Sequence, residues 1–104
     1  MARNPRLPLT ETVYYILLAL LQPAHGYLIM SRVEEMSAGQ VRLAPGTLYG
    51  ALDNLVKQRL IGRVPSEDPR RKVYQVTDDG ADVLAGDTER MAHMIEAYQQ
   101  AQRG

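Results

Sequence analysis

The stretch PGTLYGALDNLVK at residues 45–57 decides the fold, together with the segments on either side of it. A proline is well tolerated at the first position of a helix, because the N–H that it lacks would have no partner there. Apolar side chains then recur at helical spacing and form one stripe, made of Leu48, Leu52, Leu55 and Val56. We therefore predict an amphipathic helix here, with one face in a core.

Two further helices are predicted before this one. The first follows Thr10, a residue type that caps helix N-termini, and it contains the apolar run from Val13 to Leu21. Pro23 is expected to stop it. The second runs from Tyr27 to about Met36, with Gly39 as its C-terminal signal. This second helix, a short turn and the third helix at residues 45–57 are together typical of a helix-turn-helix.

The period of the sequence changes after the third helix. Residues 61–64 and 73–76 have the composition and the rough alternation of strands, and residues 65–72 between them read as a surface turn. Thr77 and the two acids after it are expected to cap a last helix from Asp78 to about Gln102. The fold class is therefore mainly α with a small β-hairpin: a winged helix-turn-helix (α-α-α-β-β) plus a long C-terminal dimerisation helix.

We expect one structural domain, in which residues 1–76 are the winged helix-turn-helix and residues 77–104 are the dimerisation helix. The chain of 104 residues has no cysteine, and its two histidines stand far apart, so neither a metal site nor a cofactor is expected. Without a catalytic constellation, an enzyme is not expected either. The longest apolar run is far shorter than the roughly 20 residues of a membrane span, and no signal peptide is seen. A cytoplasmic protein with no membrane partner is predicted.

The net charge of zero hides an asymmetry along the chain. Residues 1–76 carry ten Lys and Arg against six Asp and Glu, whereas residues 77–104 carry two against six. A basic body with an acidic end can offer one surface to phosphate while the molecule stays neutral. Ordinary scatter of charges over a small protein is the alternative interpretation.

Four segments of the sequence resemble the PadR family of bacterial transcriptional regulators over about residues 10–85. They are HGY at 25–27, PGTLYGAL at 45–52, LI at 60–61 and YQVTDDG at 74–80. The resemblance implies a homodimer that binds double-stranded DNA through the third helix and the wing, and repression that a small molecule or a signal releases. It also implies that the last helix contacts the partner subunit. Because the chain ends soon after that helix, it resembles the short branch of the family.

Two groups of residues are candidates for DNA contact. On the third helix they are Thr47, Tyr49, Asn54 and Lys57, for which a solvated face is the alternative. In the wing they are the three successive cations Arg70, Arg71 and Lys72, which would neutralise phosphates or else balance the acids beside them. Tyr27 would hold a phosphate or cover the core. Arg3 and Arg6 would form an arm on the DNA backbone or a disordered end.

The last helix carries its own apolar stripe, for which little of the domain remains as a packing partner. The predicted dimer interface consists of Leu84, Met91, Met94, Ile95 and Tyr98. Methionines adapt to varied ligands, so a pocket for a small-molecule effector between two subunits is left open. A winged helix that binds another protein and no DNA is the alternative function.

Overall fold

The computed structural model describes residues 4–104, so Arg3 of the predicted N-terminal arm lies outside the described residues. Within this range the elements follow the predicted order, with one short strand added. They are α1 (Glu11–Ala19), β1 (Ala24–His25), α2 (Gly26–Met36), α3 (Pro45–Lys57), β2 (Ile61–Val64), β3 (Val73–Val76) and α4 (Asp78–Arg103). The mainly helical winged-helix class is confirmed, and the two predicted strands have the predicted bounds.

The sheet of the described chain has three strands in the order β1-β3-β2, whereas the sequence predicted a hairpin of two. β2 and β3 pair antiparallel, with Ile61 opposite Val76, and form the wing together with the loop of residues 65–72. β1 pairs with the other edge of β3, with Ala24 opposite Tyr74. A strand of two residues is too short to show an alternating pattern. Its pairing nevertheless ties the start of α2 to the wing.

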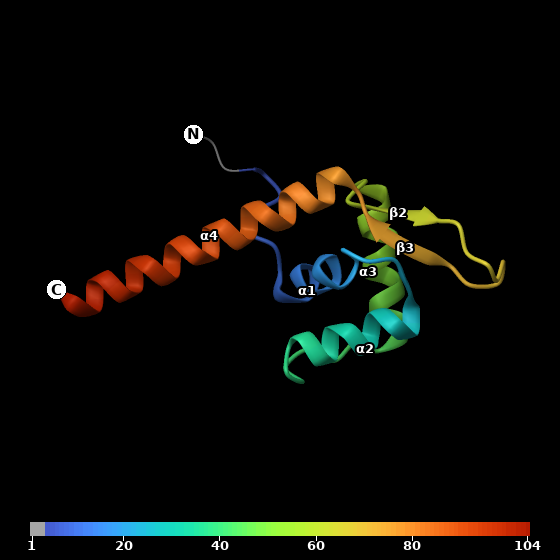
Figure 1. Cartoon of the computed structure of the whole chain (residues 1–104), viewed down its shortest axis with the longest axis horizontal. Helices are drawn as coiled ribbons and strands as arrows, with labels where there is room; N and C mark the ends of the chain where they lie inside the picture. Colours follow the sequence, from blue (N-terminus) through green and yellow to red (C-terminus); the bar gives the residue numbers. More distant parts are fainter. Residues whose placement is uncertain (1–3) are drawn as a thin grey trace.

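The three short helices and the first part of α4 enclose one hydrophobic core (Figure 1). Fully buried side chains come from each of these helices and from β2; they include Ile16, Leu17, Ile29, Val33, Leu48, Leu52, Leu55, Ile61 and Val83. The stripe of α3 that the sequence predicted thus faces this core, except that Val56 at its edge is 37% exposed. The opposite face of α3 is left free.

α1 ends at Ala19, before the Pro23 that was expected to stop it. The Arg32 Nη1 donates hydrogen bonds to the carbonyl oxygens of Ala19 at 2.9 Å and Gln22 at 3.0 Å at this end. A cation at a helix C-terminus is favourable, because it satisfies carbonyls that have no partner in the helix and opposes the negative end of the dipole. Arg32 therefore joins α2 to the end of α1.

α4 is docked on the wing by its first turn. The Thr77 hydroxyl accepts a hydrogen bond from the Gly80 N–H at 3.0 Å, and it donates one to the Arg59 carbonyl oxygen at 2.7 Å. The predicted cap is thereby confirmed. A Cβ atom at position 80 would overlap the Leu60 carbonyl oxygen, so the helix can approach this backbone only with glycine there.

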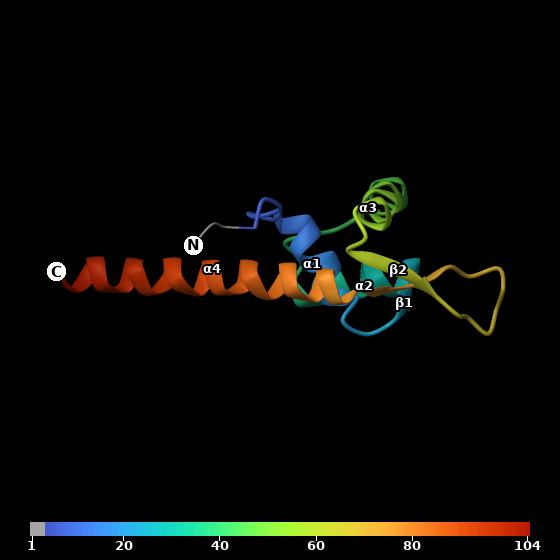
Figure 2. The same ribbon diagram turned by 90° about the horizontal axis from the view of Figure 1, so that it is seen from above.

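The protomer is elongated because α4 continues far beyond the core (Figures 1 and 2). The chain measures 57 × 31 × 20 Å, and its radius of gyration is 15.3 Å. A compact chain of this length would have a radius of gyration of about 13 Å. Both views show α4 and the wing projecting from opposite ends of the body. No helix among the described residues combines the length and the apolar character needed to cross a membrane.

Candidate nucleic-acid interface

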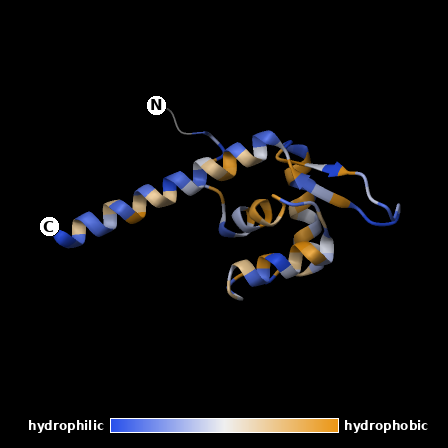
Figure 3. Cartoon of the chain, in the orientation of Figure 1, coloured by the Kyte–Doolittle hydropathy of each residue, from blue (hydrophilic) through white to orange (hydrophobic). Residues whose placement is uncertain are grey.

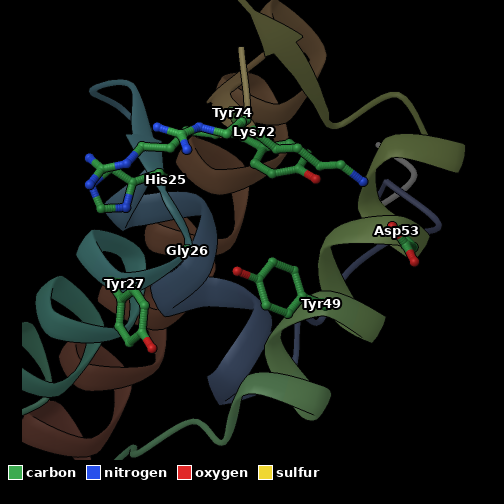
Figure 4. A pocket seen from close by; sticks show the side chains of 9 residues that line it. His25, Gly26, Tyr27, Tyr49, Asp53, Lys72 and Tyr74 are labelled. Atoms are coloured by element: carbon green, nitrogen blue, oxygen red, sulfur yellow. The ribbon is translucent and has the colours of Figure 1, made fainter. Parts of the chain in front are cut away.

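A hollow of about 540 Å³ lies where the start of α2, the middle of α3 and the exit of the wing meet (Figure 4). Its lining consists of three cations, three tyrosines, a histidine, a glycine and one acid: Arg70, Arg71, Lys72, Tyr27, Tyr49, Tyr74, His25, Gly26 and Asp53. Cationic groups and hydroxyls are the side chains that proteins use to hold phosphate. The composition of the hollow therefore favours a phosphate-bearing ligand over an apolar one.

Tyr49 enters the hollow from α3, and its hydroxyl lies beside the first turn of α2 (Figure 4). A Cβ atom at position 26 would overlap this hydroxyl, so a larger residue there would have to displace the end of the Tyr49 side chain. Tyr49 nevertheless remains 45% exposed. Its ring thus positions α3 against α2, while the hydroxyl stays near the surface of the hollow. The two motifs HGY and GTLY meet at this contact.

The loop of the wing is built around Asp68. The Oδ1 atom of Asp68 accepts hydrogen bonds from the Arg70 backbone N–H at 2.9 Å and from the Arg70 Nε at 3.3 Å. These two bonds, the backbone one above all, hold the pKa of Asp68 below its usual range. The Asp68 carbonyl oxygen in turn accepts from the Ser66 hydroxyl and from the Arg71 N–H, each at 3.0 Å. Short-range hydrogen bonds therefore hold the loop in shape.

The three cations of the wing differ in their surroundings. Arg70 forms an ion pair with Asp68, with its Nε 3.3 Å from Oδ1. Arg71 and Lys72 are exposed, and within residues 4–104 neither forms an ion pair. These two side chains therefore carry most of the uncompensated positive charge of the hollow.

Tyr74 lines the hollow from β3, yet it is only 4% exposed. Burial raises the pKa of its hydroxyl, the Arg63 guanidinium lowers it, and the nearby Asp53 carboxylate raises it further. The Arg63 guanidinium carbon lies 5.9 Å from the centroid of the Tyr74 ring, within cation–π range. Tyr74 is thus a neutral, well-packed wall between the wing and α3.

Two positions on the exposed face of α3 have no side chain. Gly46 and Gly50 lie there one turn apart, and a Cβ atom at either position would meet nothing within 4 Å. Packing in the described chain therefore does not require either glycine. Gly50, in the helix interior, lowers the stability of the helix by about 1 kcal/mol relative to alanine. Their effect is to leave helix backbone open to the close approach of another molecule.

The residues predicted to contact DNA lie in two places. Tyr27, Tyr49 and residues 70–72 meet in the hollow. Thr47, Asn54 and Lys57 are exposed on α3 outside it. Asn54 instead lines a second, smaller hollow of about 250 Å³, together with Arg6 from the segment before α1. The structure thus gathers the first group and spreads the second along the free face of α3.

Four residues of the hollow were not among the predicted site residues. They are His25, Gly26, Asp53 and Tyr74. In the sequence, His25 belongs to a turn, Asp53 to a solvated helix face and Tyr74 to a strand. The pairing of β1 with β3 sets His25 beside Tyr74, and the packing of α3 against α2 adds Asp53. The sequence did not predict this pairing, because residues 24–25 are too few to show the alternating pattern of a strand.

The apolar stripe predicted on α4 is divided in two by the structure. The prediction that Leu84 belongs to the dimer interface is corrected. Leu84 is 5% exposed and packs in the core of its own protomer, so little of its surface is left for a partner. Met91 is partly buried. Met94, Ile95 and Tyr98 are 47%, 58% and 63% exposed. The unpartnered part of the stripe therefore begins only in the distal half of α4.

Just before that point, an ion pair lies within α4 and one hydrogen bond joins α4 to α1. The Asp87 side chain is 1% exposed and accepts a hydrogen bond from the Arg90 Nε at 2.7 Å. The hydroxyls of Tyr14 and Thr88 are 2.7 Å apart and share a hydrogen bond. A hollow of about 300 Å³ lies here; it is lined by Leu9, Glu11, Tyr14, Tyr15, Asp87, Arg90 and Met91.

Comparison with known proteins assigns this architecture. The sequence model of the transcriptional regulator PadR-like family matches residues 16–86. The chain belongs to the PadR-like family. The match spans the core, the hollow and the start of α4. The PadR-like family is one of transcriptional regulators and not of enzymes.

The curated relatives that the chain matches are longer proteins. An uncharacterized 37.1 kDa protein of transposon TN4556 from Streptomyces fradiae is 36% identical over 72 residues, which are 69% of this chain and 20% of that protein. The transcriptional regulator YqjI of Escherichia coli is 33% identical over 73 residues, 70% of this chain and 34% of YqjI. The chain thus spans between a fifth and about a third of the length of these relatives.

Solved structures have the same fold. RosR of H. salinarum is 25% identical with a TM-score of 0.68, and the match covers 93% of this chain and 98% of RosR. A PadR family transcriptional regulator from Eggerthella lenta is 22% identical with a TM-score of 0.69, covering 88% of this chain and 80% of that one. The likeness to the second structure concerns the fold alone.

Proposed function

We propose that this PadR-like chain is a sequence-specific regulator that binds a palindromic operator in double-stranded DNA as a homodimer and represses transcription in the cytoplasm. The observation that carries the proposal is the hollow of cations and tyrosines beside the bare face of α3. A helix free on one face fits the major groove, and a cationic hairpin beside it reaches the neighbouring phosphates.

The side chains divide by role in this proposal. Arg71 and Lys72 neutralise phosphates from the wing, and the hydroxyls of Tyr27 and Tyr49 donate to the phosphate between wing and helix. Thr47 and Asn54 read base edges, since a threonine methyl packs on thymine and an asparagine pairs with adenine. Lys57, at the end of α3, contacts the backbone on the far side of the groove.

The homodimer is supported by the distal half of α4. Met94, Ile95 and Tyr98 are exposed on a helix that projects beyond the core. Exposed apolar side chains in a row are typical of an interface, and a two-fold dimer would bury this row against its own copy. Two winged helices on a two-fold axis would read half-sites about 34 Å apart.

Release by a small-molecule effector is part of the proposal. The hollow between α1 and α4 lies beside the proposed interface, and it combines two tyrosines with the Asp87–Arg90 pair and Met91. A ligand held there would shift α4 against α1 and so change the spacing of the two α3 helices. A small dimer lying across a promoter blocks transcription by occupancy alone, which favours repression.

The first test measures binding to duplex DNA from upstream of the chain's own gene, by fluorescence anisotropy at several salt concentrations. Tight binding with a steep salt dependence is expected. Arg71→Ala should make the slope of log K against log salt shallower by about 2, because a dimer loses two phosphate contacts. The matched control is Arg103→Ala at the far end of α4, which should leave the slope unchanged.

The second test concerns base reading. Thr47→Ala combined with Asn54→Ala should narrow the gap in affinity between the operator and random duplex. An equal fall in both affinities would make these residues backbone contacts. Absence of duplex binding by the unaltered chain at low salt would refute the proposed function and favour a winged helix that binds another protein.

A further inference from the structure

Asp53 is the one acid among the side chains of the cationic hollow. It lies on α3 one turn after Tyr49, on the opposite side of the hollow from His25 (Figure 4). Phosphate binding does not explain a carboxylate in this place, because a carboxylate repels phosphate. The residue is also exposed, so it is not held there by the core.

Within the described chain, no structural role accounts for Asp53 either. Its carboxylate has no hydrogen-bond or ion-pair partner among residues 4–104. Aspartate is a poor former of helix interiors. The position therefore costs helix stability without a compensating contact in the protomer.

The surroundings of Asp53 on α3 supply a reason. Gly46, Gly50, Asp53 and Lys57 are spaced four, three and four residues apart, so they follow one line along the exposed face of the helix. The two glycines leave the backbone bare along that line. An aspartate side chain is short, and it reaches a base edge only if the helix itself comes close to the floor of the groove.

We propose that Asp53 is a base-reading residue whose carboxylate accepts a hydrogen bond from the exocyclic amino group of a cytosine in the major groove. Such amino donors belong to cytosine and adenine alone in that groove. Adenine presents the acceptor N7 beside its amino group, which repels a carboxylate, whereas cytosine has no acceptor in that place. The inference rests on the proposed DNA interface and adds to it a specificity-determining residue.

Binding-site selection from a randomised duplex library tests this with the full chain and with Asp53→Asn. The unaltered protein should select cytosine at one position of each half-site, and Asp53→Asn should select adenine there, because an amide pairs with adenine. Affinity should fall by about 5- to 140-fold for each half-site that keeps the original base. Affinity for random duplex should rise, since a negative charge is removed. Asp82→Asn, an exposed acid on α4, is the matched control and should change neither result.

A modified operator separates base reading from charge. With 2-pyrimidinone in place of that cytosine, the amino group is absent, so the unaltered protein should lose affinity while Asp53→Ala should be indifferent. Circular dichroism should show the same helix content in all variants. Unchanged base preference in Asp53→Asn, with equal changes for selected and random DNA, would overturn the proposal, as would selection of adenine by the unaltered protein. If the unaltered protein selects no sequence at all, the proposed function itself fails.

Discussion

The wing end and the distal half of α4 both project from the core, but they expose different chemistry (Figure 3). The wing loop is hydrophilic along its length, and its shape comes from hydrogen bonds within the loop around Asp68. Figure 3 shows hydrophobic positions at intervals along the distal half of α4, where Ile95 and Tyr98 are exposed. The wing loop is stable in water as it stands, whereas the distal half of α4 exposes apolar side chains that have no packing partner in the described protomer.

The difference shows how exposure should be interpreted in this protein. Cations such as Arg71 are well solvated in the free protomer, so their exposure without a phosphate costs little free energy. Exposed side chains such as Ile95 carry a free-energy penalty until another apolar surface covers them. We therefore expect the wing to bind its ligand reversibly. We expect the distal half of α4 to be buried in a permanent interface.

The largest expected effect comes from a substitution in the exposed apolar row of α4. Ile95→Glu would place a charge without a partner in the proposed interface, so the dimer should dissociate. Operator affinity should fall by about 100-fold or more, because one winged helix buries too little DNA surface for tight binding. Sedimentation velocity and anisotropy measure the two effects.

A matched change off the stripe controls for charge. Ala97→Glu adds the same charge to an exposed position of the same helix, and it should leave both the dimer and the affinity nearly intact. If Ile95→Glu remains a dimer, the interface lies elsewhere. If it becomes a monomer and still binds the operator tightly, the two-fold arrangement is wrong.

The next effect concerns the joint between the core and α4. Gly80→Ala would force a Cβ atom into the Leu60 carbonyl oxygen and Val76, so the free energy of unfolding should fall by about 3 kcal/mol. Gly86→Ala in the same helix is the control. Its Cβ atom would lie 3.5 Å from Leu7, an ordinary contact, and helix propensity should raise stability by about 0.5–1 kcal/mol. Urea denaturation that shows equal effects for both would refute the proposed close approach.

A smaller effect distinguishes Arg32, which stabilises the fold, from Arg71, which we expect to bind DNA. Arg32→Ala removes hydrogen bonds from a cation to the carbonyls after α1, so it should lower the free energy of unfolding by about 2 kcal/mol. The salt dependence of DNA binding should stay the same. Arg71→Ala should do the opposite, changing the salt slope while leaving stability within about 0.5 kcal/mol. A salt slope altered by Arg32→Ala would place that residue at the DNA instead.

The smallest effect is a titration in the wing loop. Because the folded protein lowers the pKa of Asp68, ionised Asp68 stabilises the loop above its ordinary pKa of 3.8, and this contribution is lost as the pH falls through the lowered value. NMR titration should place the midpoint below 3.8. Arg70→Ala should bring it only part of the way back, since the backbone N–H still donates. A midpoint at or above 3.8 would contradict the hydrogen bonds described here.

Much of the fold could be predicted from local signals. Thr10 and Thr77 have the cap roles that their residue types favour, and the left-handed Gly39 donates its N–H to the Glu34 carbonyl oxygen at 2.8 Å after α2. Proline at the start of α3 has the place predicted for it. The candidate site was predicted in part, because cations and tyrosines carry recognisable chemistry wherever they lie.

The sequence by itself determined which segments are helices and strands, because caps, breakers and apolar periods act over a few residues. It also determined the chemistry of both ends, cationic in the wing and apolar along α4. Only the tertiary structure decided that Leu84 lies in the core, that Arg32 binds the carbonyls at the end of α1 and that Asp53 lines the hollow. Each of these depends on contacts between segments far apart in the chain, and β1 shows the limit: a strand of two residues exists only because β3 is there to pair with it.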